Sequence, residues 1–257
     1  MGRQSSIEQR KADLVFPNLK PQSEIDCEVS PVVLWRRSKP LGPLPKRSIK
    51  LPLRRPIQTF PDVACKAVVL SVRNIHEHGD LYLRYLQARR EVFIVQKGWQ
   101  LPEADGMEFD QYDTPLARWI ALERNGEILG GARISPTTAM CGSHSYMIRD
   151  AQLGHLPSIP EDLLFDLAPV HPKIWEATRL FLTDAVPSSQ RSEIQSCLMR
   201  ELASAARGVG ATHIIGIVPA IFCRWLKRIG MAAGAMGPIM SIDGDKVQAA
   251  LMNVETT

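Results

Sequence analysis

Apolar and polar residues alternate regularly only from Lys66 onward, and this part of the chain carries the predicted helices and strands. Residues 119–134 form two apolar runs around Asn125-Gly126, which predicts a hairpin with a type I′ turn. Residues 99–117 are polar with Gly and Pro, and we expect a loop. Further strands are predicted at 66–72, 174–182, 212–218 and 235–242, the last closing the sheet, and amphipathic helices at 80–93, 190–207 and 221–229. A hairpin followed by alternating strands and helices predicts an α/β fold with a mixed sheet.

The first 60 residues have a different composition. Eight prolines, at 17, 21, 31, 40, 43, 45, 52 and 56, are spaced too closely for a helix or a central strand. Residues 31–60 also hold eight basic residues and no acidic one. We therefore expect 1–60 to be a basic, Pro-rich, disordered extension and 61–257 to be the folded domain. A solvated tail is the favoured interpretation of the extension, and an arm that binds anions is the alternative.

Composition excludes several protein classes. The chain has 257 residues, 45% of them hydrophobic, which is enough to bury a sizeable core. It has no apolar run of membrane-spanning length and its start lacks the apolar stretch of a secretory signal, so we expect a cytoplasmic protein with no membrane partner. The five cysteines contain no C-x-x-C pair, so neither a disulfide framework nor a metal site is expected. Nothing beyond the basic extension suggests a nucleic-acid partner.

Charged residues concentrate in two places. The segment GMEFDQYD (106–113) brings Glu108, Asp110 and Asp113 into one short loop, where three carboxylates repel one another unless cations compensate them. Glu176 and Arg179 lie inside the apolar strand IWEATRLFL (174–182). Residues three apart lie on opposite faces of a regular strand, unless a bulge redirects one of them.

Buried charges need partners. We therefore expect Glu176 and Arg179 to join one network with Arg133 and the three loop carboxylates. Arg89 and Arg90, from the predicted helix, are further cations close to the loop.

Six segments together carry a family resemblance. They are ARREVF (88–93), Trp99, GMEFDQYD (106–113), GGAR (130–133), YMIRD (146–150) and IWEATR (174–179). In order and spacing, the chain resembles the acyl-homoserine-lactone synthases, the LuxI-type autoinducer synthases of bacterial quorum sensing, over about residues 66–245. The resemblance implies a single-domain fold like the N-acetyltransferases, with a V-shaped opening in the sheet for the acyl-pantetheine arm. It also implies the reaction of an acyl-carrier-protein thioester with S-adenosylmethionine, giving acyl-homoserine lactone, methylthioadenosine and free carrier protein.

The resemblance also implies roles for individual residues. For the S-adenosylmethionine pocket it implies Arg89, Phe93, Trp99, Asp110 and Asp113, and for catalysis Glu108, Arg133, Glu176 and Arg179. S-adenosylmethionine is a substrate, and no cofactor is implied. Carboxylates and aromatic faces suit its sulfonium and ammonium groups, and an arginine suits its carboxylate. Acylation needs a neutral amine, and Glu108 is the candidate base.

Three positions bear on the acyl chain. Thr178 stands where the family commonly has Ser, which preserves the hydroxyl. Gln152 stands where a phenylalanine is frequent and changes one wall of the implied pocket. Gly216 stands where a threonine is often associated with 3-oxo chains, which favours a different chain. Close packing at a strand glycine explains Gly216 equally well.

Two features of the sequence bear on whether the acyl donor is acyl carrier protein or acyl-coenzyme A. In the predicted helix 221–230, Arg224, Lys227 and Arg228 lie opposite Phe222 and Ile229, and carrier proteins are acidic. A basic helix end that is simply solvated is the alternative. The turn at 184–190 has no glycine, whereas acetyltransferases that use coenzyme A commonly bind its pyrophosphate on a glycine-containing turn. We favour acyl carrier protein and leave acyl-coenzyme A open.

Two other functions compete with a synthase. One is an N-acyl amino acid synthase of the same fold, which uses another amine and closes no lactone. The other is a degenerate, non-catalytic protein whose basic extension binds an acidic partner. The presence of Arg89, Phe93 and Trp99 argues against the first, and the complete charged set argues against the second. The acyl chain and the oligomeric state are not predicted.

Overall fold

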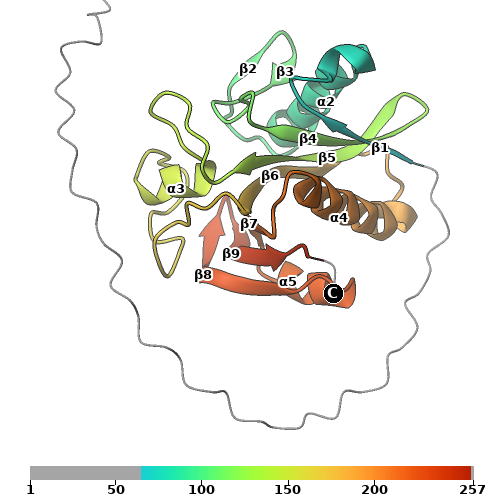
Figure 1. The fold of residues 1–257 in the computed structure, drawn as a ribbon. Helices are drawn as coiled ribbons and strands as arrows, with labels where there is room; N and C mark the ends of the chain where they lie inside the picture. Colours follow the sequence, from blue (N-terminus) through green and yellow to red (C-terminus); the bar gives the residue numbers. More distant parts are fainter. Residues whose placement is uncertain (1–64, 256–257) are drawn as a thin grey trace, which may run out of the picture. The chain divides into compact units, whose positions relative to one another are not determined.

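The computed structural model describes residues 65–255, except for the side chains of Cys223, Lys227 and Arg228. One seven-stranded sheet has the order β1-β4-β5-β6-β7-β9-β8 (Figure 1). Its strands are β1 (Lys66–Leu70), β4 (Arg118–Arg124), β5 (Glu127–Pro136), β6 (Ile174–Leu182), β7 (His213–Pro219), β8 (Ala233–Ile242) and β9 (Asp245–Asn253). The helices are η2 (Ile75–His78), α2 (Leu81–Arg90), the π-helical η3 (Glu91–Gln96), α3 (Met147–Gln152), η4 (Ser188–Gln190), α4 (Arg191–Gly208) and α5 (Phe222–Arg228). A two-stranded pair, β2 (Glu103–Ala104) and β3 (Met107–Glu108), lies in the segment predicted as a loop.

The predicted hairpin is confirmed as β4 and β5. Asn125 and Gly126 have φ of 52° and 81°, and a type I′ turn requires positive φ at both central residues. The mixed sheet is also confirmed, because β6 and β7 are parallel while the other neighbouring strands are antiparallel.

The sheet opens between β6 and β7. These strands pair only from Ile174↔His213 to Glu176↔Ile215, and β7 continues in register with β9 alone. Beyond Glu176, β6 keeps its partner on the β5 side only. The predicted V-shaped opening is therefore present at the middle of the sheet.

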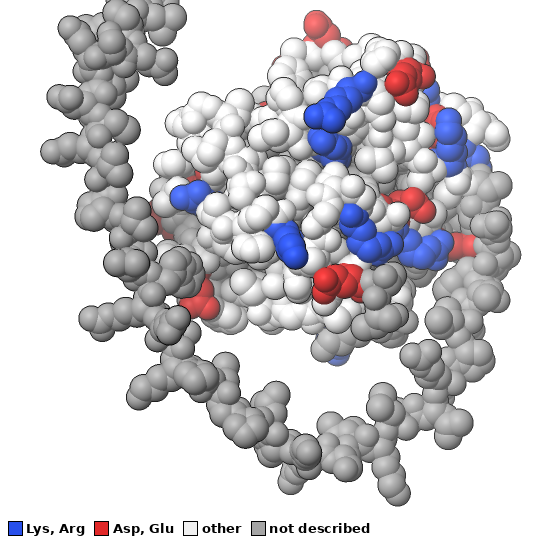
Figure 2. Space-filling view, viewed as in Figure 1, with Lys and Arg blue, Asp and Glu red and all other residues white. Residues whose placement is uncertain are grey.

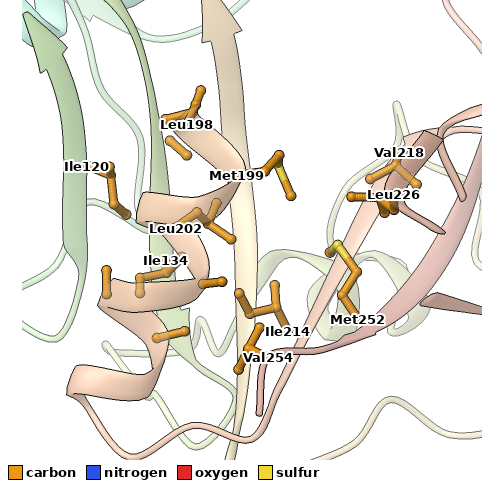
Figure 3. Close-up of a cluster of buried hydrophobic side chains, with 14 of the residues drawn as sticks. Ile120, Ile134, Leu198, Met199, Leu202, Ile214, Val218, Leu226, Met252 and Val254 are labelled. Carbon is orange, nitrogen blue, oxygen red and sulfur yellow. The ribbon is translucent and has the colours of Figure 1, made fainter. Parts of the chain in front are cut away.

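Two helices cover opposite faces of the first strands. Alternate residues of β4 point to opposite faces, so Ile120 and Leu122 pack with α4 while Trp119 and Ala121 pack with α2. Figure 3 shows Leu198, Met199 and Leu202 of α4 directed at the sheet. A third apolar cluster lies at α3, where Ile148 packs with Leu163 and Ile215.

The prediction was wrong about the last strand. The strand near 235–242 is present as β8 and forms the edge of the sheet, but it is not the last strand of the chain, because β9 follows and lies between β7 and β8. The predicted extension over 1–60 lies outside the described residues. None of the helices in the described part is long and apolar enough to cross a membrane.

Candidate active site

A bulge in β6 directs Arg179 into the site. Arg133 of β5 pairs with Thr178, but the next pair is Gly131 with Phe181, so Arg179 and Leu180 together stand opposite one residue of β5. Arg179 has φ of 53°, which is uncommon for a residue with a side chain. The bulge explains how an arginine three residues after Glu176 reaches the loop carboxylates.

Three arginines and three carboxylates form a closed network, called here the charged ring. The Arg89 guanidinium donates to Glu108 at 2.6 Å and, through two nitrogens, to Asp113 at 2.8 and 3.0 Å. Arg133 donates to both oxygens of Asp110 at 2.5 and 3.1 Å, and lies 2.9 Å from Asp113. Arg179 donates to Glu108 at 3.1 Å and to Asp110 at 2.9 Å.

The charged ring is buried and electrically balanced. Its side chains are at most 10% exposed, and Arg179 is the most exposed of them. Burial raises the pKa of Asp110, but Arg133 and Arg179 outweigh burial and hold this pKa below its ordinary value. Arg133 and Arg89 likewise outweigh burial at Asp113 and lower its pKa. Each carboxylate is thus compensated by arginines of the chain itself.

The sequence prediction missed two partners of the ring. Trp119 Nε1 donates to Asp113 at 2.7 Å, and Trp119 reads from the sequence as an ordinary strand residue. The guanidinium carbon of Arg133 lies 5.8 Å from the Tyr112 ring centre, and the Tyr112 hydroxyl donates to the buried Asp150 at 3.0 Å. Both Tyr112 and Asp150 occur in the quoted motifs, which was the available signal.

Two predicted aromatic residues lie beside the ring. Phe93, in the π-helical turn η3, stacks on Trp99 with 5.1 Å between ring centres and 16° between ring planes. The guanidinium carbon of Arg179 lies 5.6 Å from the centre of the Phe93 ring. The Phe93 and Trp99 side chains therefore place an aromatic surface next to Arg179, the most exposed arginine of the charged ring.

Glu176 is not a member of the charged ring, which corrects the predicted single network. Its two carboxylate oxygens accept the backbone N–H groups of Met147 at 3.0 Å and Ile148 at 2.7 Å, at the start of α3. Its side chain is buried, and burial raises its pKa to about 7, even though those N–H groups and Arg133 lower it. Glu176 is thus a buried acid that titrates near neutral pH, close to the ring but outside it.

The three predicted acyl-pocket residues contact different parts of the structure. Thr178 Oγ1 accepts a hydrogen bond from Arg133 Nε at 3.0 Å, so its hydroxyl helps to orient Arg133 in the charged ring. A Cβ added at Gly216 would lie 3.0 Å from the carbonyl oxygen of Ala177, which makes close packing a sufficient reason for glycine. Gln152 bonds the backbone of Asp166 and Ala168, and so holds the loop after α3.

The predicted docking residues lie on α5. Phe222 is buried and Arg224 is exposed, as the helical pattern requires. The side chains of Lys227 and Arg228 lie outside the described part. Within residues 65–255, no group of three or more His, Cys, Asp or Glu side chains is arranged to hold a metal ion.

Comparison with known proteins identifies similar sequences. The family model of the autoinducer synthases matches residues 74–257. An acyl-homoserine-lactone synthase of Acinetobacter baumannii is 30% identical over 197 residues, which cover 73% of this chain and 99% of that synthase. One of Ralstonia solanacearum is 30% identical over 177 residues, covering 66% of this chain and 80% of that synthase.

Solved structures extend the comparison. TofI, crystallised in a ternary complex with an inhibitor and MTA, superposes with a TM-score of 0.59 at 29% identity, covering 74% of this chain and 92% of its own. The synthase LasI has a TM-score of 0.62 at 22% identity, with 74% and 90% covered. BjaI, a CoA-dependent acyl-homoserine lactone synthase bound to SAM and isopentyl-CoA, has a TM-score of 0.58 at 19% identity, with 74% and 84% covered. At these two lower identities the likeness concerns the fold alone.

Proposed function

This chain belongs to the autoinducer synthase family, and from that premise we propose that it makes an acyl-homoserine lactone from S-adenosylmethionine and an acyl thioester. The predicted family resemblance and the assignment as an acyltransferase are confirmed by the same matches. In the proposed reaction the substrate amine attacks the thioester carbonyl and releases the carrier thiol. The carboxylate of the acylated product then displaces methylthioadenosine at the γ-carbon and closes the lactone.

The completeness of the charged ring carries the proposal. Burying three guanidinium groups and three carboxylates costs desolvation free energy that apolar side chains of similar volume would not require. A protein that had lost its chemistry would gain nothing from the six charges. Their retention, with the aromatic pair beside them, favours a working synthase over a degenerate binding protein.

The ring suggests how S-adenosylmethionine is held. Because the carboxylates of the charged ring are already paired with arginines, they hold those arginines in place and are not free counterions for the substrate. Arg179 is the least buried of the three guanidinium groups, at 10% exposure, and suits the substrate carboxylate. Trp99 stacks on Phe93, and the Lys97 ammonium lies 4.9 Å from the centre of its ring, so the substrate sulfonium would take the place of Lys97 on this face.

The structure and the sequence prediction favour different residues as the general base. Both oxygens of Glu108 are occupied by guanidinium groups, Oε2 by Arg89 and Oε1 by Arg179. Glu176 has no charged hydrogen-bond partner among the described residues, and a pKa near 7 matches a general base at neutral pH. We therefore favour Glu176 as the base and assign to Glu108 the positioning of Arg89 and Arg179.

A comparison of two variants tests this assignment. Glu176→Gln should lower kcat for acylation by about 10²-fold or more, with little change in the KM for S-adenosylmethionine. Glu108→Gln should instead destabilise the protein and raise that KM, because two buried arginines lose their shared partner. A Glu108→Gln enzyme that stays stable and loses only kcat would return the base to Glu108.

The products decide between the synthase and its two rivals. Thiol release and methylthioadenosine release are followed together in the unmodified protein. Equal amounts establish acylation coupled to lactone closure. Thiol release without methylthioadenosine would identify an N-acyl amino acid synthase, and neither product with any acyl donor would leave the binding-only function.

Acyl carrier protein remains our preferred donor. Arg191, Arg200 and Arg207 of α4 are exposed, and Figure 2 shows basic side chains over this helix. Arg200 and Arg207 line a hollow of about 290 Å³ together with Ile229, directly after α5. The exposed arginines of α4 would suit an acidic partner, with Glu255 as the one carboxylate that lines the same hollow. Comparing kcat/KM for matched acyl-carrier-protein and acyl-coenzyme A donors tests this choice.

A further inference from the structure

Ser135 of β5 has a buried hydroxyl without a protein partner. The residue is 6% exposed, and its Oγ makes no hydrogen bond to any described residue. Buried hydroxyl groups normally find a partner, either in the protein or in an ordered water. Neither the sequence pattern nor the family motifs quoted above singled out this serine.

Strand register places Ser135 next to Glu176. The two residues are directly paired between β5 and β6, two positions along from the pair formed by Arg133 and Thr178. The hydrogen bond between Arg133 and Thr178 shows that the side chains of that pair share one face, and strand alternation places Ser135 and Glu176 on the same face. Directly opposed residues have Cβ atoms about 5 Å apart, a separation that one water molecule can bridge.

The hydrogen-bonding capacity of the two groups is complementary. Each oxygen of Glu176 accepts one backbone N–H, which leaves further lone pairs on the carboxylate. A serine hydroxyl can donate one hydrogen bond and accept two. A water placed between them could therefore donate to Glu176, accept from Ser135 and still face the substrate.

We propose that Ser135 and Glu176 together hold one water molecule that carries the amine proton of S-adenosylmethionine to Glu176. As the nitrogen attacks the thioester carbonyl, its N–H bond breaks and the proton passes to the water. The water gives one of its other hydrogens to the Glu176 carboxylate, so water is regenerated and the carboxylate becomes a carboxylic acid. Ser135 is thus a positioning residue, and the inference rests on the proposed synthase function with Glu176 as base.

Other groups around Glu176 bear on its titration. Arg133 on β5 lowers its pKa and Asp110 of the charged ring raises it. Tyr112 and Tyr146 face it from the site loop and from the start of α3, and burial together with the Glu176 charge raises the pKa of both hydroxyl groups, so both stay neutral. Ser135→Ala removes only the hydroxyl oxygen and leaves all four of these groups in the chain. A shift in the pH profile of a Ser135 variant therefore reports on the hydroxyl itself.

The test uses the full chain with acyl-carrier protein and S-adenosylmethionine. Ser135→Ala should lower kcat about tenfold, the equivalent of one lost hydrogen bond, and leave the KM for S-adenosylmethionine unchanged. The acid limb of the kcat profile should move to higher pH, because the lost water no longer donates to the charged carboxylate. Ser135→Thr, which keeps the hydroxyl, should restore both quantities.

Ser196 provides a matched control. It is a buried serine at 5% exposure on α4, and its hydroxyl bonds the carbonyl of Ser192 away from the site. Ser196→Ala should leave kcat and the pH profile unchanged. If Ser135→Ala does not fold, Ser135→Cys, which keeps the volume with a weak S–H donor, is measured in its place.

The outcomes separate the inference from the function on which it rests. An unchanged kcat and pH profile in Ser135→Ala would overturn the inference, as would a raised KM with normal kcat. If the unmodified protein releases no methylthioadenosine, the proposed synthase function fails instead, and no Ser135 variant is needed to show it.

Discussion

Glu176 is a carboxylic acid that the fold has removed from water, at a place where two backbone N–H groups are its hydrogen-bond donors. Its raised pKa means that the folded protein binds a proton between pH 4.5 and 7 that the unfolded chain does not bind. The stabilising contribution of this proton is fully present below pH 4.5 and is lost as pH rises through 7. The ring carboxylates Asp110 and Asp113 act in the opposite direction, since their lowered pKa values remove stability only as pH falls below their ordinary range.

The pH dependence of unfolding therefore isolates Glu176. In the unmodified protein, its contribution should reduce the free energy of unfolding by about 3 kcal/mol between pH 4.5 and 7. Glu176→Gln should lose this component of the slope. Urea unfolding of both proteins from pH 5 to 8 measures the difference. Parallel pH profiles for the two proteins would show that Glu176 is ionised throughout this range.

Strand β5 packs closely against its neighbours at two adjacent glycines, Gly130 and Gly131. A Cβ at Gly131 would lie 2.4 Å from the Tyr85 ring and 2.6 Å from the carbonyl oxygen of Ile120, so the space beside this strand is already filled. The bulge at Arg179 begins opposite this point. Close packing at the glycine and the redirected arginine thus belong to one local structure.

Gly131→Ala should consequently cost stability and activity together. The added methyl group meets backbone as well as a ring, so we expect a loss of about 1–3 kcal/mol in the free energy of unfolding. Because Arg133 lies two residues away, kcat should fall as well. Gly208→Ala is the control, since nothing lies within 4 Å of a Cβ at that helical position and alanine favours the helix. Chemical unfolding of both variants measures the contrast.

At the level of elements, the sequence pattern predicted helices and strands correctly where the segment is long. The helix over 190–207 was predicted because many of its apolar residues share one face. The hairpin over 119–134 was predicted from Asn125-Gly126 between two apolar runs. The six residues of α3 are too few to display a helical period. Strand β9 was missed although Asp243-Gly244, with φ of 50° and 83°, forms the same kind of turn as Asn125-Gly126.

The site was predictable in composition but not in pairing. Buried charges in a short loop and an apolar strand indicated a network, and five of its six members were placed there from this argument. The pairing of each carboxylate with its arginines depends on the bulge in β6, and no residue type in that strand predicts the bulge. The separation of Glu176 from the ring depends on α3, whose N–H groups no pattern had located.

At the scale of the whole chain, about a quarter of the sequence lies outside the alignment with a relative that is itself aligned almost completely. The Acinetobacter baumannii synthase is aligned over 99% of its length by only 73% of this chain. The predicted extension over 1–60 therefore adds to a unit that is already complete in that relative.

A chain that begins at Asp62 should keep its activity. We expect soluble protein with kcat and KM for S-adenosylmethionine within about twofold of the full chain, because the described helices and strands begin only at Lys66. Side-by-side kinetics and thermal unfolding of the two chains provide the measurement. Insoluble or inactive protein would place the boundary of the catalytic domain earlier in the sequence.

The charged ring also constrains how this sequence can diverge. Each ring member is shared between two partners of opposite charge, so a neutral substitution at one position leaves one net uncompensated charge in the protein interior. A single substitution at one of these positions should therefore cost stability, and the paired loss of one arginine and one carboxylate is the smallest change that keeps the charge balanced. We therefore expect the six ring residues to change together among related synthases, whereas positions outside the ring can vary one at a time.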